Sequence, residues 1–113
     1  MTDVPMESVP NMPTQGFTLL DVRESNEWAA GHAPDALHIP LGELPSRIEE
    51  IAQLPEDRPL YVVCRTGGRS SQAAAWLNDN GFDAVNVAGG MKSWQTENRP
   101  LVCDHPDIAP DVL

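Results

Sequence analysis

Cys64 is the side chain of this sequence best placed for nucleophilic chemistry. It directly follows the apolar run Leu60–Val63 and precedes a polar loop. Ser70 opens a helical sequence, which predicts that the thiol faces a helix N-terminus, where free N–H groups and the helix dipole favour a thiolate. Arg65 and Arg69 add positive charge close by. We therefore favour a reactive thiol over the alternative, a buried structural cysteine.

The loop that follows Cys64 has the composition of an anion-binding site. Gly67 and Gly68 allow the backbone to curl so that successive N–H groups converge on one point. Two chemistries fit a nucleophilic cysteine in such a loop, namely phosphate transfer through a phosphocysteine and sulfur transfer through a persulfide. Cysteine phosphatases resemble one another in a Cys-x5-Arg loop, but here position 70 is serine and the arginine stands one place earlier, at Arg69. The shorter loop indicates a smaller bound group.

Apolar runs and helical segments alternate along the chain. Strands are predicted at residues 17–22, 36–39, 60–63 and 84–87, and helices at residues 25–30, 45–54, 70–80 and 91–95. This alternation predicts an α/β fold with a mainly parallel sheet flanked by helices. Ligands of such sheets bind beyond the carboxyl ends of the strands, which is where Cys64 is expected. Ser25 is the expected N-cap of the first helix, and Gly81 the expected end of the third.

Segments that contain several prolines flank the predicted domain. Residues 1–16 are expected to form an irregular arm, in which only residues 6–9 favour a short edge strand. The domain is expected to cover residues 17–97, and residues 98–113, with prolines among scattered acidic residues, are expected to form a tail. A chain of 113 residues is long enough for one domain with its own core.

The charge of the chain argues against several classes of partner. The net charge is -10, from 17 acidic and 7 basic residues, so neither nucleic acid nor an anionic membrane is expected as a partner. Because cations are few, the pair of arginines beside Cys64 indicates an anionic substrate. No apolar run approaches the length of a membrane span and no secretory leader pattern is present, so we expect a cytoplasmic protein. A reducing compartment would keep Cys64 and Cys103 unpaired.

The loop at residues 64–70 resembles the active-site loop of single-domain rhodanese-like sulfurtransferases. Further segments stand in the order seen in that family: Leu20-Asp21-Val22-Arg23-Glu24, Glu27-Trp28, Gly31-His32, His38-Ile39-Pro40-Leu41, and Gly89-Gly90-Met91 with Trp94. Together they cover roughly residues 17–96. One departure follows His32, where Ala33-Pro34-Asp35-Ala36 replaces the usual Ile-Pro-Gly-Ala. It touches a turn and not the nucleophile.

This resemblance implies a rhodanese-like domain and a sulfur-transfer cycle. The Cys64 thiolate would attack the outer sulfur of a small anionic donor, thiosulfate or another sulfane, and carry that sulfur as a persulfide to a thiol, to cyanide or to a protein acceptor. The implied substrate-binding residues are Arg65, Thr66, Gly67, Gly68, Arg69 and Ser70. Asp21 and Arg23 are expected to support the site by pairing with each other. No metal or organic cofactor is needed.

Other interpretations stay open at this point. The domain could serve as a sulfur-relay or regulatory binding module with little turnover. The loop spacing is less favourable to a small cysteine phosphatase or an arsenate reductase. Cys103 is expected to be incidental, with a role as a resolving or sulfur-accepting thiol as the alternative. His32 and His38 are expected to make structural hydrogen bonds.

Overall fold

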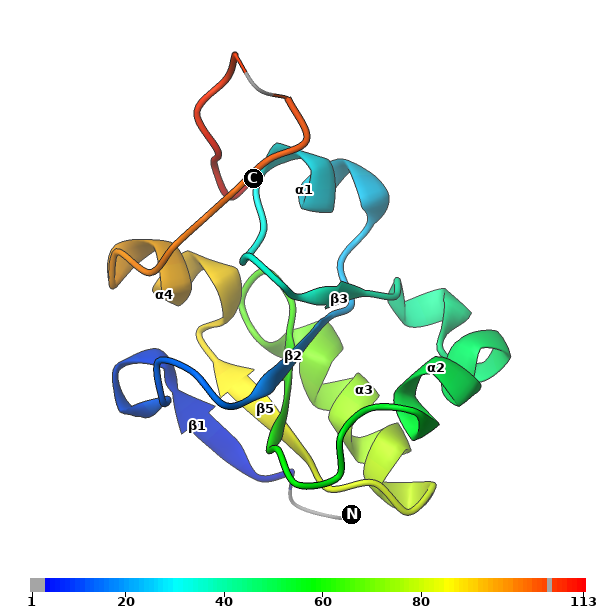
Figure 1. Cartoon of the computed structure of the whole chain (residues 1–113). Helices are drawn as coiled ribbons and strands as arrows, with labels where there is room; N and C mark the ends of the chain where they lie inside the picture. The colour runs from blue at the N-terminus through cyan, green and yellow to red at the C-terminus, as the bar shows by residue number, and fades with distance from the viewer. Residues whose placement is uncertain (1–3, 106) are drawn as a thin grey trace.

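The computed structural model describes residues 4–105 and 107–113. At its centre is a five-stranded sheet in the order β1-β5-β4-β2-β3, in which all neighbouring strands are parallel (Figure 1). The strands are β1 (Met6–Ser8), β2 (Thr18–Asp21), β3 (Leu37–His38), β4 (Leu60–Val63) and β5 (Ala84–Ala88). The predicted mainly parallel sheet is therefore confirmed, and β4, the strand that leads to Cys64, lies in its middle.

The sheet is buried on both faces. Along β4, Val62 packs into one core, whereas Tyr61 and Val63 pack into the other. This double burial is typical of parallel sheets and explains why the strand is a continuous apolar run. It also fixes the end of the strand, because the polar loop after Cys64 cannot continue into either core.

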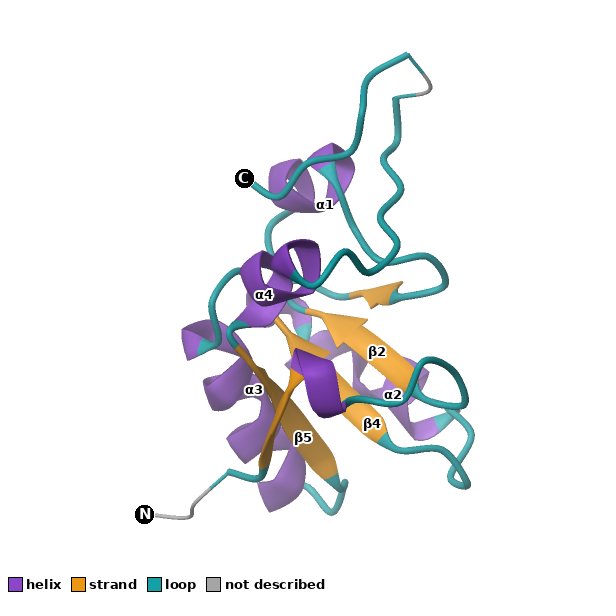
Figure 2. Ribbon diagram, turned by 90° about the vertical axis from the view of Figure 1, so that its left-hand side faces the viewer, coloured by secondary structure: helices purple, strands orange, loops and turns teal. Residues whose placement is uncertain are grey.

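Helices form a layer on each face of the sheet. Helices α2 (Ile48–Ala52) and α3 (Gly68–Asp79) cover one face, and Figure 2 shows α3 beside β5. Helix α4 (Gly90–Thr96) and the 3₁₀ turn Val9–Asn11 cover the other face. Helix α1 (Ser25–Ala30) contributes no buried residue and lies beyond the carboxyl ends of the strands (Figure 1). The space next to Cys64 is therefore bordered by α1 and by the starts of α3 and α4.

The starts of two helices differ from the prediction. Glu24, and not Ser25, caps α1, because the side chains of Glu24 and Glu27 each accept the main-chain N–H of the other. Helix α3 begins at Gly68 and not at Ser70, and the Ser70 hydroxyl contacts Cys64 and Asn86 instead of capping the helix. Gly81, with a φ of +91°, follows the end of α3 as predicted.

The helix predicted at residues 45–54 is also shorter than expected. The segment consists of the 3₁₀ turns Leu41–Glu43 and Pro45–Arg47, followed by the five-residue α2. The physical reason is the backbone of Arg47, which leaves the helical region with φ -119° and ψ 17° and so interrupts a continuous helix.

The flanking segments pack against the same body. Strand β1, at the position allowed for a short edge strand in the arm, pairs with β5, although residues 1–3 of that arm lie outside the described residues. In the tail, Val102 forms an antiparallel bridge with His32, and Val112 is buried beside Met91 and Trp94. Pro106 of the tail lies outside the described residues.

In the part of the chain that the structure describes, none of the helices is both long and apolar enough to cross a membrane.

Candidate active site

Cys64 lies where β4 ends and is 1% exposed. Gly67, in the left-handed region with a φ of +119°, turns the chain back so that α3 starts almost directly after the strand. The sulfur therefore sits at the N-terminus of a 12-residue helix, as the sequence predicted. Such a position supplies main-chain N–H groups and the positive end of the helix dipole.

Two hydrogen-bond donors point at the Cys64 sulfur. The Gly67 N–H lies 3.1 Å from Sγ, and the Ser70 hydroxyl oxygen lies 3.3 Å from it. Burial by itself raises the pKa of Cys64, but hydrogen bonds from the Ser70 side chain and from the main chain of Ser70, Gly67 and Thr66 outweigh it, so the pKa lies below its ordinary value. The arrangement favours a thiolate, which is the nucleophilic form of cysteine.

Helix α4 holds the start of the loop from the other side. The Met91 N–H donates to the Cys64 carbonyl at 2.8 Å, and the Lys92 N–H donates to the Arg65 carbonyl at 3.1 Å. This close approach needs Gly90, whose φ is +60° and whose position leaves a side chain no room, since a Cβ would lie 2.5 Å from each of the two carbonyl oxygens. The sequence analysis named Gly90 only as part of the segment Gly89-Gly90-Met91 and missed this role.

Asn86 on β5 is a second residue that the sequence analysis missed. It is 4% exposed, and its Oδ1 lies 2.5 Å from the Ser70 hydroxyl oxygen. Its Nδ2 donates to the Gly67 carbonyl at 3.2 Å. One signal was available in the sequence, because Asn86 is a lone amide inside an otherwise apolar buried strand. Such a group needs hydrogen-bond partners, and here both come from the cysteine loop.

Both loop arginines already have partners. Arg69 forms an ion pair with Glu27 on α1, through two hydrogen bonds of 2.7 and 2.9 Å. The hydrogen bond from Arg69, opposed by burial and assisted by the Glu24 N–H, lowers the pKa of Glu27 to about 2. Arg65 is exposed, and its Nε donates to the Leu113 main-chain oxygen at 2.7 Å. Thr66 and Gly68 are exposed at the mouth of the loop.

The Asp21–Arg23 pair lies buried at the carboxyl end of β2, the strand that pairs with β4. The closest contact, Arg23 Nη2 to Asp21 Oδ2, is 2.6 Å, and both side chains are almost fully buried. Arg23 Nη2 also donates to the Gly31 carbonyl at 2.8 Å, which ties α1 to the sheet. His38 Nε2 bonds to the Arg23 carbonyl at 2.8 Å, and His32 Nδ1 bonds to the Trp28 carbonyl at 2.7 Å. These contacts are those of structural groups.

Cys103 does not lie among the residues that contact the Cys64 sulfur. Its sulfur lies 3.1 Å from each of the His105 and Ile108 carbonyl oxygens in the tail, which are the two acceptors for its single S–H hydrogen. Both cysteines are free thiols. Within residues 4–105 and 107–113, no three His, Cys, Asp or Glu side chains come together in a way that could hold a metal ion.

Comparison with known proteins extends this picture over most of the chain. The rhodanese-like domain family matches residues 7–97. The putative sulfurtransferase YtwF of Bacillus subtilis is 42% identical over 82 residues, which are 73% of this chain and 77% of that protein. The thiosulfate sulfurtransferase GlpE of Pseudomonas syringae is 38% identical over 94 residues, which are 82% of this chain and 86% of that protein.

Solved structures give the same result. A rhodanese-related protein of Thermoplasma volcanium aligns with a TM-score of 0.71 at 35% identity, over 79% of this chain and 86% of that one. The likeness therefore holds in both sequence and fold. With this agreement added to the cysteine loop described above, the chain belongs to the single-domain rhodanese-like family of sulfurtransferases.

Proposed function

We propose that this protein moves sulfane sulfur from thiosulfate or a persulfide donor to a thiol or cyanide acceptor through a persulfide on Cys64. The observation that carries the proposal is the pair of donors, Gly67 N–H and Ser70 O–H, aimed at a buried sulfur at the N-terminus of α3. A small, amide-lined loop suits a single anionic sulfur atom.

The cycle balances without a cofactor. The Cys64 thiolate attacks the outer sulfur of thiosulfate, the sulfur–sulfur bond of thiosulfate breaks, and its electron pair leaves with sulfite. The charge then rests on the outer sulfur of the new persulfide, which the N–H groups of the loop stabilise. An acceptor thiolate or cyanide attacks that outer sulfur, and the Cys64 thiolate leaves.

The remaining loop residues bind the donor and the transferred sulfur. In the proposal the main chain of residues 66–70 supplies the N–H groups, while Arg65 and Arg69 attract the anionic donor. The Glu27 partner compensates much of the charge on Arg69, so the attraction falls mainly to the exposed Arg65. Asp21 and Arg23 support the site by fixing the end of β2 and the position of α1.

The acceptor decides between turnover and relay. A protein thiol as acceptor would make the domain a sulfur-relay module, whereas a small thiol or cyanide would make it an enzyme with independent turnover. In either case Cys64 must be reduced to begin the cycle, which fits a reducing compartment such as the cytoplasm.

Intact-mass measurement after incubation with thiosulfate tests the proposal. We expect the protein to gain one sulfur atom and to lose it again on addition of cyanide, while Cys64→Ser gains none. A gain of equal size in Cys64→Ser would contradict the assignment. Hydrolysis of an aryl phosphate without any gain of sulfur would instead favour a phosphatase.

A further inference from the structure

Asn86 bonds to both residues that donate to the Cys64 sulfur, Gly67 and Ser70. Its Nδ2 donates to the Gly67 carbonyl at 3.2 Å, and its Oδ1 lies 2.5 Å from the Ser70 oxygen. Asn86 stands on β5, next to β4 in the sheet, and is almost fully buried. A single side chain on a rigid strand thus bonds to the donor hydroxyl of Ser70 and to the carbonyl of Gly67, the residue whose N–H is the other donor.

The Ser70 hydroxyl has two acceptors and one hydrogen. Its oxygen lies 2.5 Å from Asn86 Oδ1 and 3.3 Å from Cys64 Sγ. A hydroxyl can donate only one hydrogen bond of ordinary strength, so the two acceptors compete for it. The Gly67 carbonyl can only accept a hydrogen bond, so the amide atom of Asn86 that faces it must be Nδ2. The other amide atom, Oδ1, therefore faces the Ser70 hydroxyl and can accept its hydrogen.

We propose that Asn86 is a positioning residue of the sulfur chemistry, which accepts the Ser70 hydrogen whenever the Cys64 sulfur is uncharged. In the thiol, the Cys64 S–H donates to the Ser70 oxygen, and the Ser70 hydrogen lies on Asn86 Oδ1. When the thiol loses its proton to solvent, the Ser70 hydrogen turns to the anionic Sγ. No bond other than the S–H bond breaks in this step.

The same switch runs in reverse when the persulfide forms. The negative charge then moves to the outer sulfur, Sγ becomes a neutral bridging atom, and the Ser70 hydrogen returns to Asn86. Without this second acceptor, the buried Ser70 hydroxyl would lack a good partner in the loaded form, at a cost typical of an unsatisfied polar group. This inference rests on the proposed function for the persulfide step only.

Removal of Asn86 leaves the rest of the loop bonded. The Gly67 carbonyl also accepts the Ser71 N–H at 3.0 Å, so it keeps a partner without the amide. The charged side chains of the packed elements are Arg65, the Arg69–Glu27 pair, the Asp21–Arg23 pair and Lys92 on α4. None of these charged residues is substituted in the variants below.

The test measures the rate of iodoacetamide alkylation of Cys64 against pH, with Cys103→Ser as the background so that only one thiol reacts. Asn86→Leu keeps the shape of the side chain and removes the acceptor, which leaves the Ser70 hydrogen to the sulfur. We expect the midpoint of the curve of rate against pH to fall by roughly half a pH unit relative to the Cys103→Ser background, which is the size of a modest hydrogen-bond gain. Asn86→Asp keeps the shape, holds the hydrogen more strongly and adds a negative charge, so its midpoint should rise, and the rise should be larger with Ser70 present than in Ser70→Ala.

A double variant and a matched control separate this role from a structural one. In the Ser70→Ala background, Asn86→Leu should no longer lower the midpoint, since no hydroxyl is left to switch. The control is Asn78→Leu, because Asn78 ties α3 to the far end of β5 through Ala84, with contacts of 2.6 and 3.1 Å. Its midpoint should equal that of the background protein.

An Asn86→Leu midpoint that is unchanged or raised, or a fall that persists without Ser70, would overturn the inference. If Asn86→Leu does not fold, Asn86→Asp decides, since a rise that is absent, or that is equal with and without Ser70, would be equally contradictory. Alkylation needs no sulfur donor, so the result is independent of the thiosulfate experiment. A protein that takes up no sulfur but shows the expected fall in Asn86→Leu and the expected rise in Asn86→Asp would refute the proposed function alone.

Discussion

The two cysteines of this chain lie in opposite kinds of hydrogen-bonding environment. Around Cys64, an N–H and an O–H group point at the sulfur, at the start of α3. Around Cys103, the carbonyl oxygens of His105 and Ile108 are the two acceptors for the single S–H hydrogen. Donors stabilise a thiolate, whereas carbonyl oxygens have no hydrogen to offer a sulfur.

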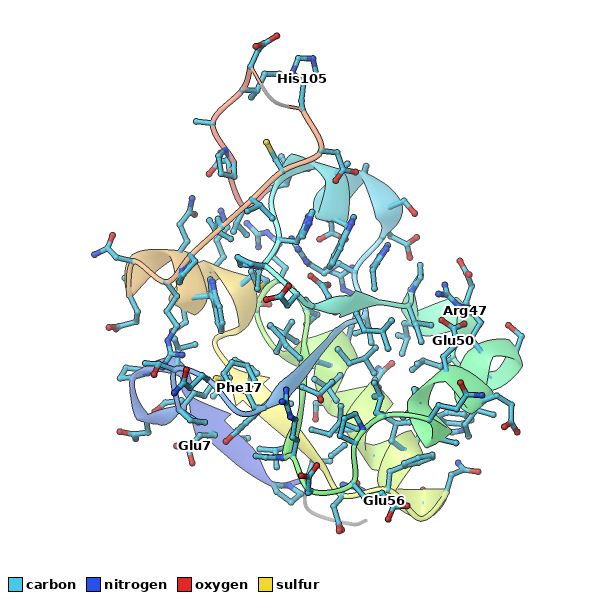
Figure 3. All side chains as sticks on the ribbon, in the orientation of Figure 1. Glu7, Phe17, Arg47, Glu50, Glu56 and His105 are labelled. Atoms are coloured by element: carbon cyan, nitrogen blue, oxygen red, sulfur yellow. The ribbon has the colours of Figure 1, made fainter. Side chains whose placement is uncertain are left out.

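The positions of the two cysteines in the fold explain this difference. Cys64 stands between a strand end and a helix N-terminus, where unpaired N–H groups collect. Cys103 stands in the tail loop, whose tip carries His105 and projects away from the sheet (Figure 3). The tail nevertheless reaches the cysteine loop, because Arg65 bonds to Leu113 and Lys92 bonds to the Val112 carbonyl. A hydrogen-bond donor of the backbone thus points at the more buried of the two sulfurs, so local polarity and not exposure distinguishes Cys64 from Cys103.

Substitution of each cysteine in turn should give the largest difference in activity between the two sites. Cys64→Ser should lower thiosulfate:cyanide turnover by more than about a thousandfold, as removal of a nucleophile does. Cys103→Ser should stay within about twofold of the unchanged protein, as for a substitution outside the site. Thiocyanate formation measures both, and a large loss in Cys103→Ser would give the tail a chemical role that the geometry denies it.

Two glycine substitutions disturb the cysteine loop and the tail separately. Gly90→Ala would force a Cβ against the Cys64 and Arg65 carbonyls at a φ of +60°, at a cost of about 2–4 kcal/mol in unfolding free energy. Gly31→Ala would overlap the Asp111 main chain in the tail, without backbone strain, at a cost of about 1–3 kcal/mol.

Denaturant unfolding together with sulfur uptake distinguishes the two variants. We expect Gly90→Ala to lose sulfur uptake even under conditions where it is folded, and Gly31→Ala to keep it. Gly42→Ala serves as a control, because a Cβ there meets no atom within 4 Å and Gly42 lies outside the cysteine loop. Equal uptake by Gly90→Ala and Gly42→Ala would show that α4 does not shape the cysteine loop.

The pH dependence of alkylation shows how far the hydrogen bonds around Cys64 lower its pKa relative to a free cysteine. Because its pKa is lowered, Cys64 should reach half of its maximal rate at a lower pH than a free cysteine, whose pKa is about 8.5. Between these two values the folded protein binds fewer protons than the unfolded chain, so its stability rises with pH. That contribution is complete above the ordinary thiol pKa and is lost as the pH falls through the lowered one. A midpoint at or above that of the urea-unfolded protein would contradict the hydrogen-bond assignment.

The smallest effect is expected at the link between the two regions, helix α1. This helix holds Arg69 through Glu27 and holds the tail through the Ala29 and Ala30 carbonyls. Glu27→Gln should reduce stability by about 1 kcal/mol at neutral pH, since Arg69 is partly exposed.

Acid titration provides the check on this pair. The Glu27 carboxylate stabilises the fold fully above its ordinary pKa of 4.5, and this contribution is lost as the pH falls towards about 2. The stability difference between the protein and Glu27→Gln should therefore shrink over that range. A difference that stays constant down to pH values near 2 would show that the ion pair does not contribute. The pair Arg47 and Glu50, labelled in Figure 3 near α2, has the more exposed carboxylate, 46% for Glu50 against 13% for Glu27, and offers a comparison remote from the loop.

The sequence predicted the elements that depend on local pattern. Strand β4, the turn at Gly67 and the position of Cys64 at a helix start follow from an apolar run, two glycines and a helical sequence that stand next to one another. The cap of α1 was misassigned because serine and glutamate both serve as caps, and only the reciprocal contact with Glu27 distinguishes them.

The contacts that complete the site lie far apart along the chain. Asn86 meets Ser70 across 16 positions, Arg69 meets Glu27 across 42, and Arg65 meets Leu113 across 48. Hydrophobic periodicity and turn chemistry carry no information on such pairings. The buried amide of Asn86 predicts that hydrogen-bond partners exist, but the identity of these partners depends on how β5 lies beside β4.

The site of sulfur attachment tests the central claim most directly. The unchanged protein is treated with a limiting amount of thiosulfate, the persulfide is trapped by alkylation, and the peptides that carry Cys64 and Cys103 are compared by mass spectrometry. We predict the added sulfur on the Cys64 peptide alone. Sulfur on the Cys103 peptide, with Cys64 unmodified, would contradict the claim that hydrogen-bond donors at the end of β4 select the sulfur-carrying thiol.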